Sequence, residues 1–275
     1  MDSSKLGHIP LGKSTDYVSL YTPSLLCGVS RLDTRESLGV PEELPFKGVD
    51  IWNAYEVSWL NSQGKPEVAI AEIVVPCSSP KLIESKSLKL YFNSFNQTPF
   101  NSWQEVTRTL ESDLTLCAQE PVMVTLHQLS QQSQLGLGSL PGTCIDHLDV
   151  DVVAYQPDPS NLCVEEGAET KESLYSDLLK SNCPVTGQPD WASVSIQYIG
   201  KKIDQAGLLK YIISFREHAG FHEQCVERIF LDIMERCQPE QLTVYARYTR
   251  RGGLDINPLR SSGAFDMENI RLPRQ

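Results

Sequence analysis

The 275-residue sequence lacks several features that mark common functional classes. No apolar run approaches the roughly 20 residues of a membrane-spanning helix, and the opening residues, MDSSKLGHIPLGKS, hold no apolar core of a secretory signal. Basic residues are scarce, since 24 Lys and Arg stand against 35 Asp and Glu, for a formal net charge of −11. Because phosphate backbones are bound by basic surfaces, this balance argues against nucleic acid as a direct partner. We therefore expect a cytoplasmic protein with no membrane partner.

Cysteine pairs at short spacing are also missing. The eight cysteines are scattered without a C-x-x-C motif, so reduced thiols are expected rather than a disulfide framework. Cys183 differs from the others, because it lies in the loop-like run S-N-C-P-V-T-G-Q-P-D-W with Asp190 seven residues later. A nucleophilic thiolate needs a nearby acid–base group, and Asp190, His222 and Glu223 are candidates for that site. An inert, half-buried thiol is the simpler alternative.

Common nucleotide and metal motifs are absent as well. There is no G-x-x-x-x-G-K-[ST] loop, and the glycines of residues 136–138 precede Ser-Leu-Pro-Gly rather than a helix. His218 and His222 are four residues apart, but Gly220 and Phe221 interrupt any shared helical face. We expect no metal site.

Alternating and amphipathic apolar patterns predict an α+β fold with antiparallel sheets and helices on one face. Expected strands cover 50–60, 66–75, 122–129, 147–155, 191–200, 208–217 and 241–248, and expected helices cover 84–96, 102–119 and 222–237. A Pro-containing acidic linker is expected from Gln156 to Asn182, with a short helix at 169–180.

A weak internal repeat accompanies this pattern. A shift of 139 residues superposes Trp52 on Trp191, Val57 on Ile196 and Glu84 on Glu223. It predicts two related modules, the first over residues 1–156 and the second, with the linker, over 157–275. A glutamate at the same place in both modules could bind a purine- or pterin-like ring edge. Favourable interaction with a helix dipole is the simpler alternative for each glutamate.

Two segments suit a phosphorylated ligand. E-S-K-S-L-K-L-Y, from Glu84 to Tyr91, places hydroxyls, Lys86 and Lys89 near an expected helix start. R-Y-T-R-R-G-G, residues 247–253, combines arginines with glycines that let a ligand approach the backbone. A solvated helix face and an exposed hairpin turn are the respective alternatives.

Together these motifs resemble a known family. Residues 84–91 match throughout the motif E-[S/L]-K-[S/A]-h-K-[L/Y]-[Y/F/W] of the nitrile reductases of queuosine biosynthesis, the QueF family of NADPH-dependent 7-cyano-7-deazaguanine reductases. Cys183, Asp190 and the F-H-E of residues 221–223 resemble its long, two-module form. The resemblance implies a homodimer with two tandem tunnelling-fold modules of ββααββ type, which bind purine- or pterin-like ligands at module interfaces.

The resemblance also implies a reaction. The nitrile of 7-cyano-7-deazaguanine would be reduced to the primary amine of 7-aminomethyl-7-deazaguanine, with two NADPH per turnover and no metal. Cys183 would form a covalent thioimide, and Asp190 would be the acid–base group. The implied substrate contacts are Ile83, Glu84, Ser85, His222 and Glu223, and the implied NADPH contacts are Ser85, Lys86, Arg251 and Gly252.

Two other functions fit parts of the sequence. A purine- or pterin-binding module without redox activity would use Glu84 and Glu223 but not Cys183. A cysteine-dependent nitrile or amidine hydrolase would need Cys183 but not the lysine motif or Arg251. The sequence leaves open which of Asp190 and His222 delivers each proton, and whether Lys89, Arg247 and Arg250 contact NADPH.

Overall fold

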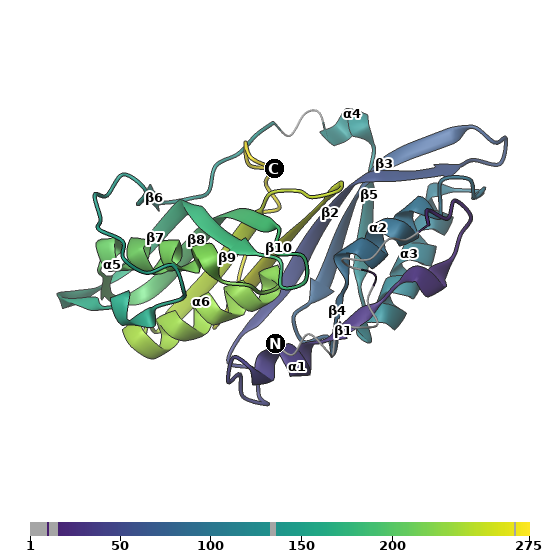
Figure 1. Cartoon of the computed structure of the whole chain (residues 1–275). Helices are drawn as coiled ribbons and strands as arrows, with labels where there is room; N and C mark the ends of the chain where they lie inside the picture. Colours follow the sequence, from purple (N-terminus) through teal and green to yellow (C-terminus); the bar gives the residue numbers. More distant parts are fainter. Residues whose placement is uncertain (1–9, 11–15, 133–135, 267) are drawn as a thin grey trace. The chain divides into compact units, whose positions relative to one another are not determined.

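The computed structural model describes residues 10, 16–132, 136–266 and 268–275 and divides into two compact units (Figure 1). The first unit comprises 1–39, 50–136 and 250–256, and the second comprises 40–49, 137–249 and 257–275. Strands β2 (Lys47–Leu60) and β10 (Leu254–Ser261) contribute residues to both units. The opening segment, for which no secretory signal is expected, lies largely outside the described residues.

The first unit is built on a mostly antiparallel sheet. Its strands follow the order β5 (Met123–His127), β3 (Pro66–Pro76), β2 and then β10, with Ile73 of β3 opposite Val124 of β5. A small separate sheet pairs β1 with β4. The remaining elements are η2 (Pro23–Leu25), β1 (Gly28–Ser30), α1 (Arg31–Glu36), β4 (Lys81–Ile83), α2 (Ser85–Asn93), α3 (Trp103–Ala118) and α4 (Leu129–Gln132).

Helices α2 and α3 supply one side of the core of this unit. From Ala69 to Val75 every second residue of β3 is buried, which is the pattern of a strand with one face in a core. Val106, Leu110 and Leu114 form the buried stripe of α3, as its period predicts. The hydroxyl of Tyr91 in α2 donates to Asp113 Oδ2 in α3 at 2.6 Å. The two helices therefore lie side by side.

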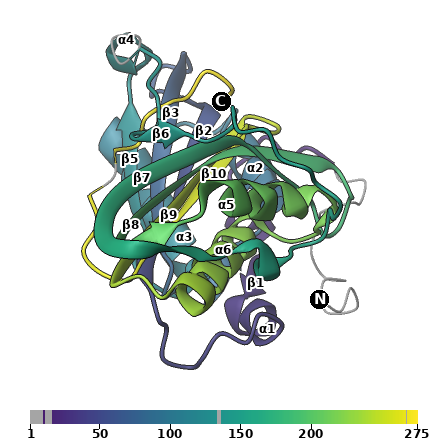
Figure 2. The ribbon, with the colours of Figure 1, turned by 90° about the vertical axis from the view of Figure 1, so that its left-hand side faces the viewer.

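The second unit has the same kind of architecture. Its strands follow the order β10, β9 (Gln241–Tyr248), β8 (Pro189–Ile203), β7 (Val164–Asn182) and β6, and among the described registers only β6 and β7 run parallel. Figure 2 shows α5 and α6 on the same side of β8 and β9. The remaining elements are β6 (Thr143–Cys144), η3 (Pro159–Asn161), α5 (Gln205–Ile213), η4 (Ser214–Glu217) and α6 (His222–Cys237).

The expected α+β fold is confirmed, and so are most of its elements. The strands expected at 50–60, 66–75, 122–129, 191–200 and 241–248 and the helices expected at 84–96, 102–119 and 222–237 are present with small differences at their ends. The helix at 222–237 has the expected bounds.

Three expectations about secondary structure are wrong. Residues 147–155 form no strand, and residues 164–182 of the expected linker, including the expected helix at 169–180, form the long strand β7. Residues 208–217 form most of α5 and the turn η4 rather than a strand. An apolar run cannot by itself distinguish a buried strand from a helix buried on several sides. The N-cap at Asp204, whose side chain accepts the N–H of Gly207, is the signal that favours the helix.

One interhelical contact recurs in the two units, at a shift that differs from the expected 139 residues. The interhelical hydrogen bond of Tyr91 and Asp113 recurs in the second unit, where Tyr211 donates to Asp232 Oδ2 at 2.7 Å. These pairs correspond to shifts of 120 residues in the first helix and 119 in the second. The shared contact supports a diverged duplication.

The expected shift of 139, and with it the pairing of Glu84 with Glu223, is wrong. Glu84 is the N-cap of α2, and its counterpart is Asp204, the N-cap of α5. Glu223 lies instead in the first turn of α6, whose counterpart is α3. The shift of 139 was chosen from identical residues, and it aligned the start of α2 with the start of α6, which are not equivalent helices.

Strand β10 was not anticipated from the sequence. It carries Arg260, which is fully buried and donates through Nε and NH2 to Glu227 Oε1 at 3.0 and 2.8 Å. From the sequence alone, a charged residue such as Arg260 is expected on the solvent-exposed face of a strand. Its burial depends on a charge partner from α6 that is 33 residues away in the sequence.

Candidate active site

Cys183 lies in the tight connection between β7 and β8 of the second unit. Its N–H donates to the carbonyl of Gln188 at 2.9 Å, and its own carbonyl accepts the N–H of Gly187 at 3.0 Å. Gly187 adopts φ +68°, a conformation that favours glycine. Cys183 is only 5 % exposed. Cys183 is therefore fixed at the base of this loop. The sequence also predicts that this cysteine lies in a loop.

Asp190 is held beside this loop by strand register. It pairs with Ser181 across the β7–β8 ladder and is buried. Residues opposite each other in an antiparallel pair share a face, and so do residues two apart in a strand. The bond of Cys183 to Gln188 extends the ladder beyond Asn182, so the Cys183 side chain is expected on the face that carries Asp190.

His222 comes to this carboxylate from a third segment. It is the first residue of α6, and its Nε2 lies 3.3 Å from Asp190 Oδ2. The loop before α6 is tied to β7, because Asn182 N–H donates to the carbonyl of His218 at 2.8 Å and Gly220 N–H donates to that of Asn182 at 3.1 Å. These two bonds hold the start of α6 next to the residue that precedes Cys183.

Glu223 follows directly in the first turn of α6 and is 4 % exposed. A carboxylate at this position interacts favourably with the helix dipole, so its burial has a structural explanation as well. Cys183, Asp190, His222 and Glu223, all of which the sequence singled out, thus lie in the second unit, and His222 contacts Asp190 directly.

Cys225, one turn further along α6, is a different kind of thiol. It is fully buried near Ser181 and Tyr248, and burial raises its pKa to about 12. A thiol with so high a pKa holds almost no thiolate at neutral pH. Cys225 is therefore unsuited to nucleophilic chemistry.

Sequence reasoning missed Tyr248, the last residue of β9. Its ring stacks on the imidazole of His222 with centroids 3.8 Å apart and planes 2° apart. Nothing in the local sequence points to this contact, because strand β9 and helix α6 meet only through the fold. Among the described residues, the buried Nδ1 of His222 has no hydrogen-bond partner.

In the first unit, Glu84 acts as a helix cap. Its two carboxylate oxygens accept the N–H groups of Lys86 and Ser87, each at 2.8 Å. Glu84 is 2 % exposed, and burial raises the pKa of its carboxyl group against the opposing effect of these bonds. Ile83, buried at the end of β4, and Ser85, the first residue of α2, flank it. The capping bonds leave further lone pairs on the carboxylate.

The turn between β9 and β10 holds Arg251 and Gly252, and a residue of α2 lies against it. A Cβ on Gly252, which has φ +59°, would be 2.8 Å from Lys89 Nζ. Lys89 also lies 3.7 Å from Glu56 Oε2. A small cavity of about 100 Å³ opens here. Its lining comprises Ala54, Glu56, Lys89, Phe92, Asn93, Asn96, Gly252, Gly253 and Leu254.

Arg247 and Arg250, for which the sequence leaves contact with NADPH open, have different surroundings in the structure. Arg250 lies over the ring of Tyr55, with its Cζ 5.1 Å from the centroid. Tyr55 donates in turn to Asp255 Oδ2 at 2.7 Å. Arg247, in contrast, is fully buried and donates to Tyr245 and other polar side chains. Arg247 is a structural residue of the second unit.

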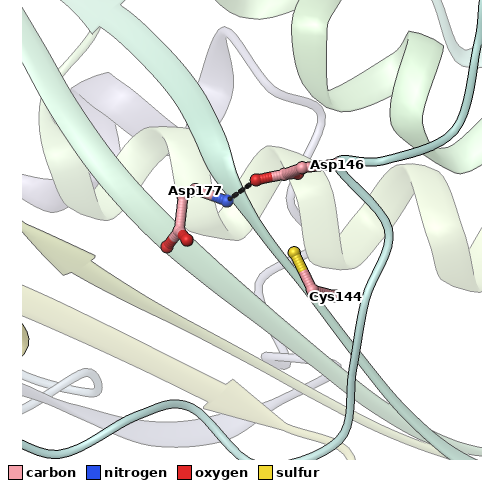
Figure 3. Close-up of side chains that lie close together, drawn as sticks. All are labelled: Cys144, Asp146 and Asp177. Carbon is pink, nitrogen blue, oxygen red and sulfur yellow. Dashed lines mark hydrogen bonds between the residues drawn. The ribbon is translucent and has the colours of Figure 1, made fainter.

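One cluster elsewhere has the composition of a metal site. One ligand atom from each of Cys144, Asp146 and Asp177 lies within 4.8 Å of the others (Figure 3). The carboxylate of Asp146 accepts the N–H of Asp177 at 2.8 Å and the hydroxyl of Ser176, where the β7–β8 register shifts. These bonds give the cluster a structural role where strand β7 is irregular.

Among the described residues, no helix combines the length and apolar character that crossing a membrane would require.

Comparisons with known proteins agree with the sequence motifs. The model of the family described as "Nitrile reductase, 7-cyano-7-deazaguanine-reductase N-term" matches residues 17–126, and that of "QueF-like protein" matches residues 189–266. The crystal structure of an archaeosine synthase QueF-Like in the apo form aligns over all of its own chain with 37 % of this chain, at 17 % identity and a TM-score of 0.31.

Two curated relatives span nearly the whole chain. The NADPH-dependent 7-cyano-7-deazaguanine reductase of Burkholderia multivorans is 55 % identical over 270 residues, 98 % of each chain. That of Dechloromonas aromatica is 56 % identical over 268 residues, 97 % of this chain and 95 % of the relative. The resemblance drawn from residues 84–91 and from Cys183 is thereby confirmed. The chain belongs to the family of NADPH-dependent 7-cyano-7-deazaguanine reductases, which are oxidoreductases.

Proposed function

We propose that the protein reduces the nitrile of 7-cyano-7-deazaguanine to a primary amine with NADPH, through a covalent thioimide on Cys183. The observation that supports this proposal is the 3.3 Å contact between His222 Nε2 and Asp190 Oδ2. Asp190 lies in the β7–β8 ladder beside the loop that holds the buried Cys183. A nucleophile beside an acid–base pair is the arrangement that covalent catalysis needs.

The chemistry divides into steps that these residues can serve. The Cys183 sulfur adds to the nitrile carbon while a proton reaches the nitrogen, which gives a thioimide that accepts hydride more readily than the nitrile. After the first hydride the carbon–sulfur bond breaks, Cys183 is released as thiolate and an imine remains. The second hydride and another proton complete the amine. Asp190, with His222 at its carboxylate, is proposed to hold and move these protons.

Glu223 is proposed to hold the edge of the deazaguanine ring, with His222 as a further contact from the second unit. A buried carboxylate can accept two N–H bonds from such an edge. Ile83, Glu84 and Ser85 are proposed substrate contacts contributed by the first unit. Because Glu84 already caps α2, its remaining lone pairs would serve the ligand.

The first unit has features that fit NADPH. Lys86 and Lys89 are three residues apart on α2, so their side chains share a face. Lys89 lies against Gly252, which follows Arg251. Cations beside an open backbone turn suit a dinucleotide phosphate. We propose Ser85, Lys86, Arg251 and Gly252 as its contacts. NADPH would supply the two hydrides, one from each of two molecules per turnover.

Gly252→Ala is expected to weaken NADPH binding. The added Cβ would meet Lys89 Nζ at 2.8 Å in a backbone conformation that alanine rarely adopts. We expect KM for NADPH to rise roughly tenfold, equivalent to about 1.4 kcal/mol, with KM for the nitrile unchanged. Steady-state kinetics measure both constants. Gly64→Ala is the matched control, because Gly64 has φ +78° and nothing lies within 4 Å of the position that its Cβ would take. Equal effects of the two substitutions would contradict the role of Gly252.

Glu223→Gln tests the proposed contact with the nucleobase. The change keeps the shape of the side chain and removes its charge, so affinity for the nitrile should fall about tenfold to a hundredfold while NADPH affinity stays unchanged. Isothermal calorimetry measures both affinities. Glu235→Gln, at an exposed position on the same helix, is the control. Equal losses for the two ligands in Glu223→Gln would count against the assignment.

A single assay tests the proposed function. The protein is mixed with 7-cyano-7-deazaguanine and NADPH, the absorbance of reduced nicotinamide is followed and the product mass is measured. We expect NADPH oxidation and the primary amine. Folded protein that binds the nitrile without oxidising NADPH would indicate a binding module, and an amide or carboxylate product would indicate a hydrolase.

Other parts of the assignment do not depend on the geometry of the candidate active site. We propose a role in queuosine biosynthesis, two tandem tunnelling-fold modules over residues 1–156 and 157–275, a homodimer, and a cytoplasmic location. The absence of a metal requirement also stays a prediction.

A further inference from the structure

The side chain of Gln275 is buried in the second unit and all of its hydrogen-bonding positions are used. Its Nε2 donates to the carbonyl of Tyr248 at 3.0 Å and to Asn257 Oδ1 at 2.9 Å. Its Oε1 accepts from Arg247 Nε at 3.0 Å and from Leu272 N–H at 3.1 Å. A primary amide has two N–H donors and two acceptor lone pairs. Four bonds therefore satisfy it completely.

These bonds fix the backbone of Tyr248 from both sides. Asn257 Oδ1, which accepts from Gln275, also accepts the N–H of Tyr248 at 3.2 Å. The carbonyl of Tyr248 is held by Gln275 directly. Tyr248 is the last residue of β9, so its position depends on these partners as well as on the strand ladder.

The fixed tyrosine lies against the candidate active site. Its fully buried ring stacks on His222 at 3.8 Å, and Nε2 of His222 is 3.3 Å from Asp190 Oδ2. Because protein interiors are closely packed, a displaced Tyr248 ring would displace the imidazole with it. A continuous set of contacts thus joins Gln275 to the Asp190 carboxylate.

We propose that Gln275 is a positioning residue, which acts through Tyr248 to hold the His222 imidazole against Asp190. This inference rests on the proposed function of Asp190 and His222. It concerns residues 269–275, a segment to which neither the sequence motifs nor the family matches at 17–126 and 189–266 give a role.

Gln275→Glu is the sharpest test, because it keeps the size of the side chain and removes both N–H donors. The carbonyl of Tyr248 and Asn257 Oδ1 would then face a carboxylate oxygen without a hydrogen between them. A displacement of about 1 Å at a catalytic group can cost roughly a hundredfold in rate. We expect kcat for nitrile reduction to fall at least about tenfold, with KM for NADPH unchanged.

A second readout does not depend on activity. A tyrosine ring stacked at 3.8 Å shields the imidazole protons of His222, so their NMR signals should move downfield in Gln275→Glu. Arg274→Ala is the matched control. The Arg274 side chain is exposed, donates to the carbonyl of Asp177 and lies over Trp191, so its loss should leave both kcat and the His222 signals unchanged.

The outcomes separate the two proposals. If the wild-type protein reduces no nitrile, the proposed function fails, and the His222 signals alone decide the positioning role. Folded Gln275→Glu with unchanged His222 signals and unchanged kcat would overturn the inference. Gln275→Ala, which leaves room for water, serves as a second variant. If neither variant folds, the segment serves stability only and the inference is wrong.

Discussion

Cys183→Ala is expected to abolish both NADPH oxidation and the covalent adduct with 7-cyano-7-deazaguanine. Without the sulfur no thioimide forms, and the nitrile carbon itself is a poor hydride acceptor. Non-covalent binding of the nitrile should persist, because its proposed contacts are untouched. Intact-protein mass spectrometry detects the adduct and calorimetry measures the binding. We expect turnover to fall by at least about a thousandfold.

The control for this substitution is Cys237→Ala. Cys237 is another buried thiol of the same unit, at the end of α6, and burial raises its pKa to about 11. Its loss should leave adduct formation intact. A covalent adduct in the Cys183→Ala protein, or none in Cys237→Ala, would refute the assignment of the nucleophile.

Asp190→Asn should have the next largest effect. The amide keeps the shape of the carboxylate but cannot take up and release the proton that the nitrile nitrogen requires. General acid–base groups typically contribute about 10²- to 10⁴-fold to the rate, so we expect losses of that size both in adduct formation and in kcat. Rapid mixing followed by mass spectrometry measures the adduct, and steady-state assays measure kcat.

Asp177→Asn is a suitable comparison for that variant. Asp177 lies in β7 of the same unit, and its Oδ1 accepts the Ser193 hydroxyl, a bond that an amide oxygen also makes. Asp177→Asn should reduce the nitrile at a rate close to that of the wild type. Asp190→Asn with kcat within about threefold of the wild type would exclude Asp190 as the main proton carrier.

The sequence predicts helix α6 better than strand β7, for a physical reason. The apolar residues of α6 recur at helical spacing and are buried along one stripe, so its bounds at 222 and 237 are predictable. Most of the N-terminal half of β7 is exposed and carries charged side chains, among them Glu165, Glu166 and Glu169. A strand stabilised by backbone pairing along one edge leaves no apolar alternation in its sequence.

The candidate site shows the same limit. Cys183, Asp190 and Glu223 could be predicted from the sequence, because their chemistry and their motifs stand out in it. Tyr248 and Gln275 could not be predicted, since their proposed role depends on contacts between distant segments, 26 residues apart for His222 and Tyr248 and 27 for Tyr248 and Gln275. The false pairing of Glu84 with Glu223 has a related origin, because residue identity was compared without knowing which helix each glutamate begins.

The most direct test of the account is the ratio of NADPH oxidised to nitrile consumed by the wild-type protein. The reduction of a nitrile to a primary amine takes four electrons, and each NADPH supplies two as hydride. We predict a ratio of two, with 7-aminomethyl-7-deazaguanine as the product identified by mass. A ratio of zero with the nitrile bound or hydrolysed would contradict the account.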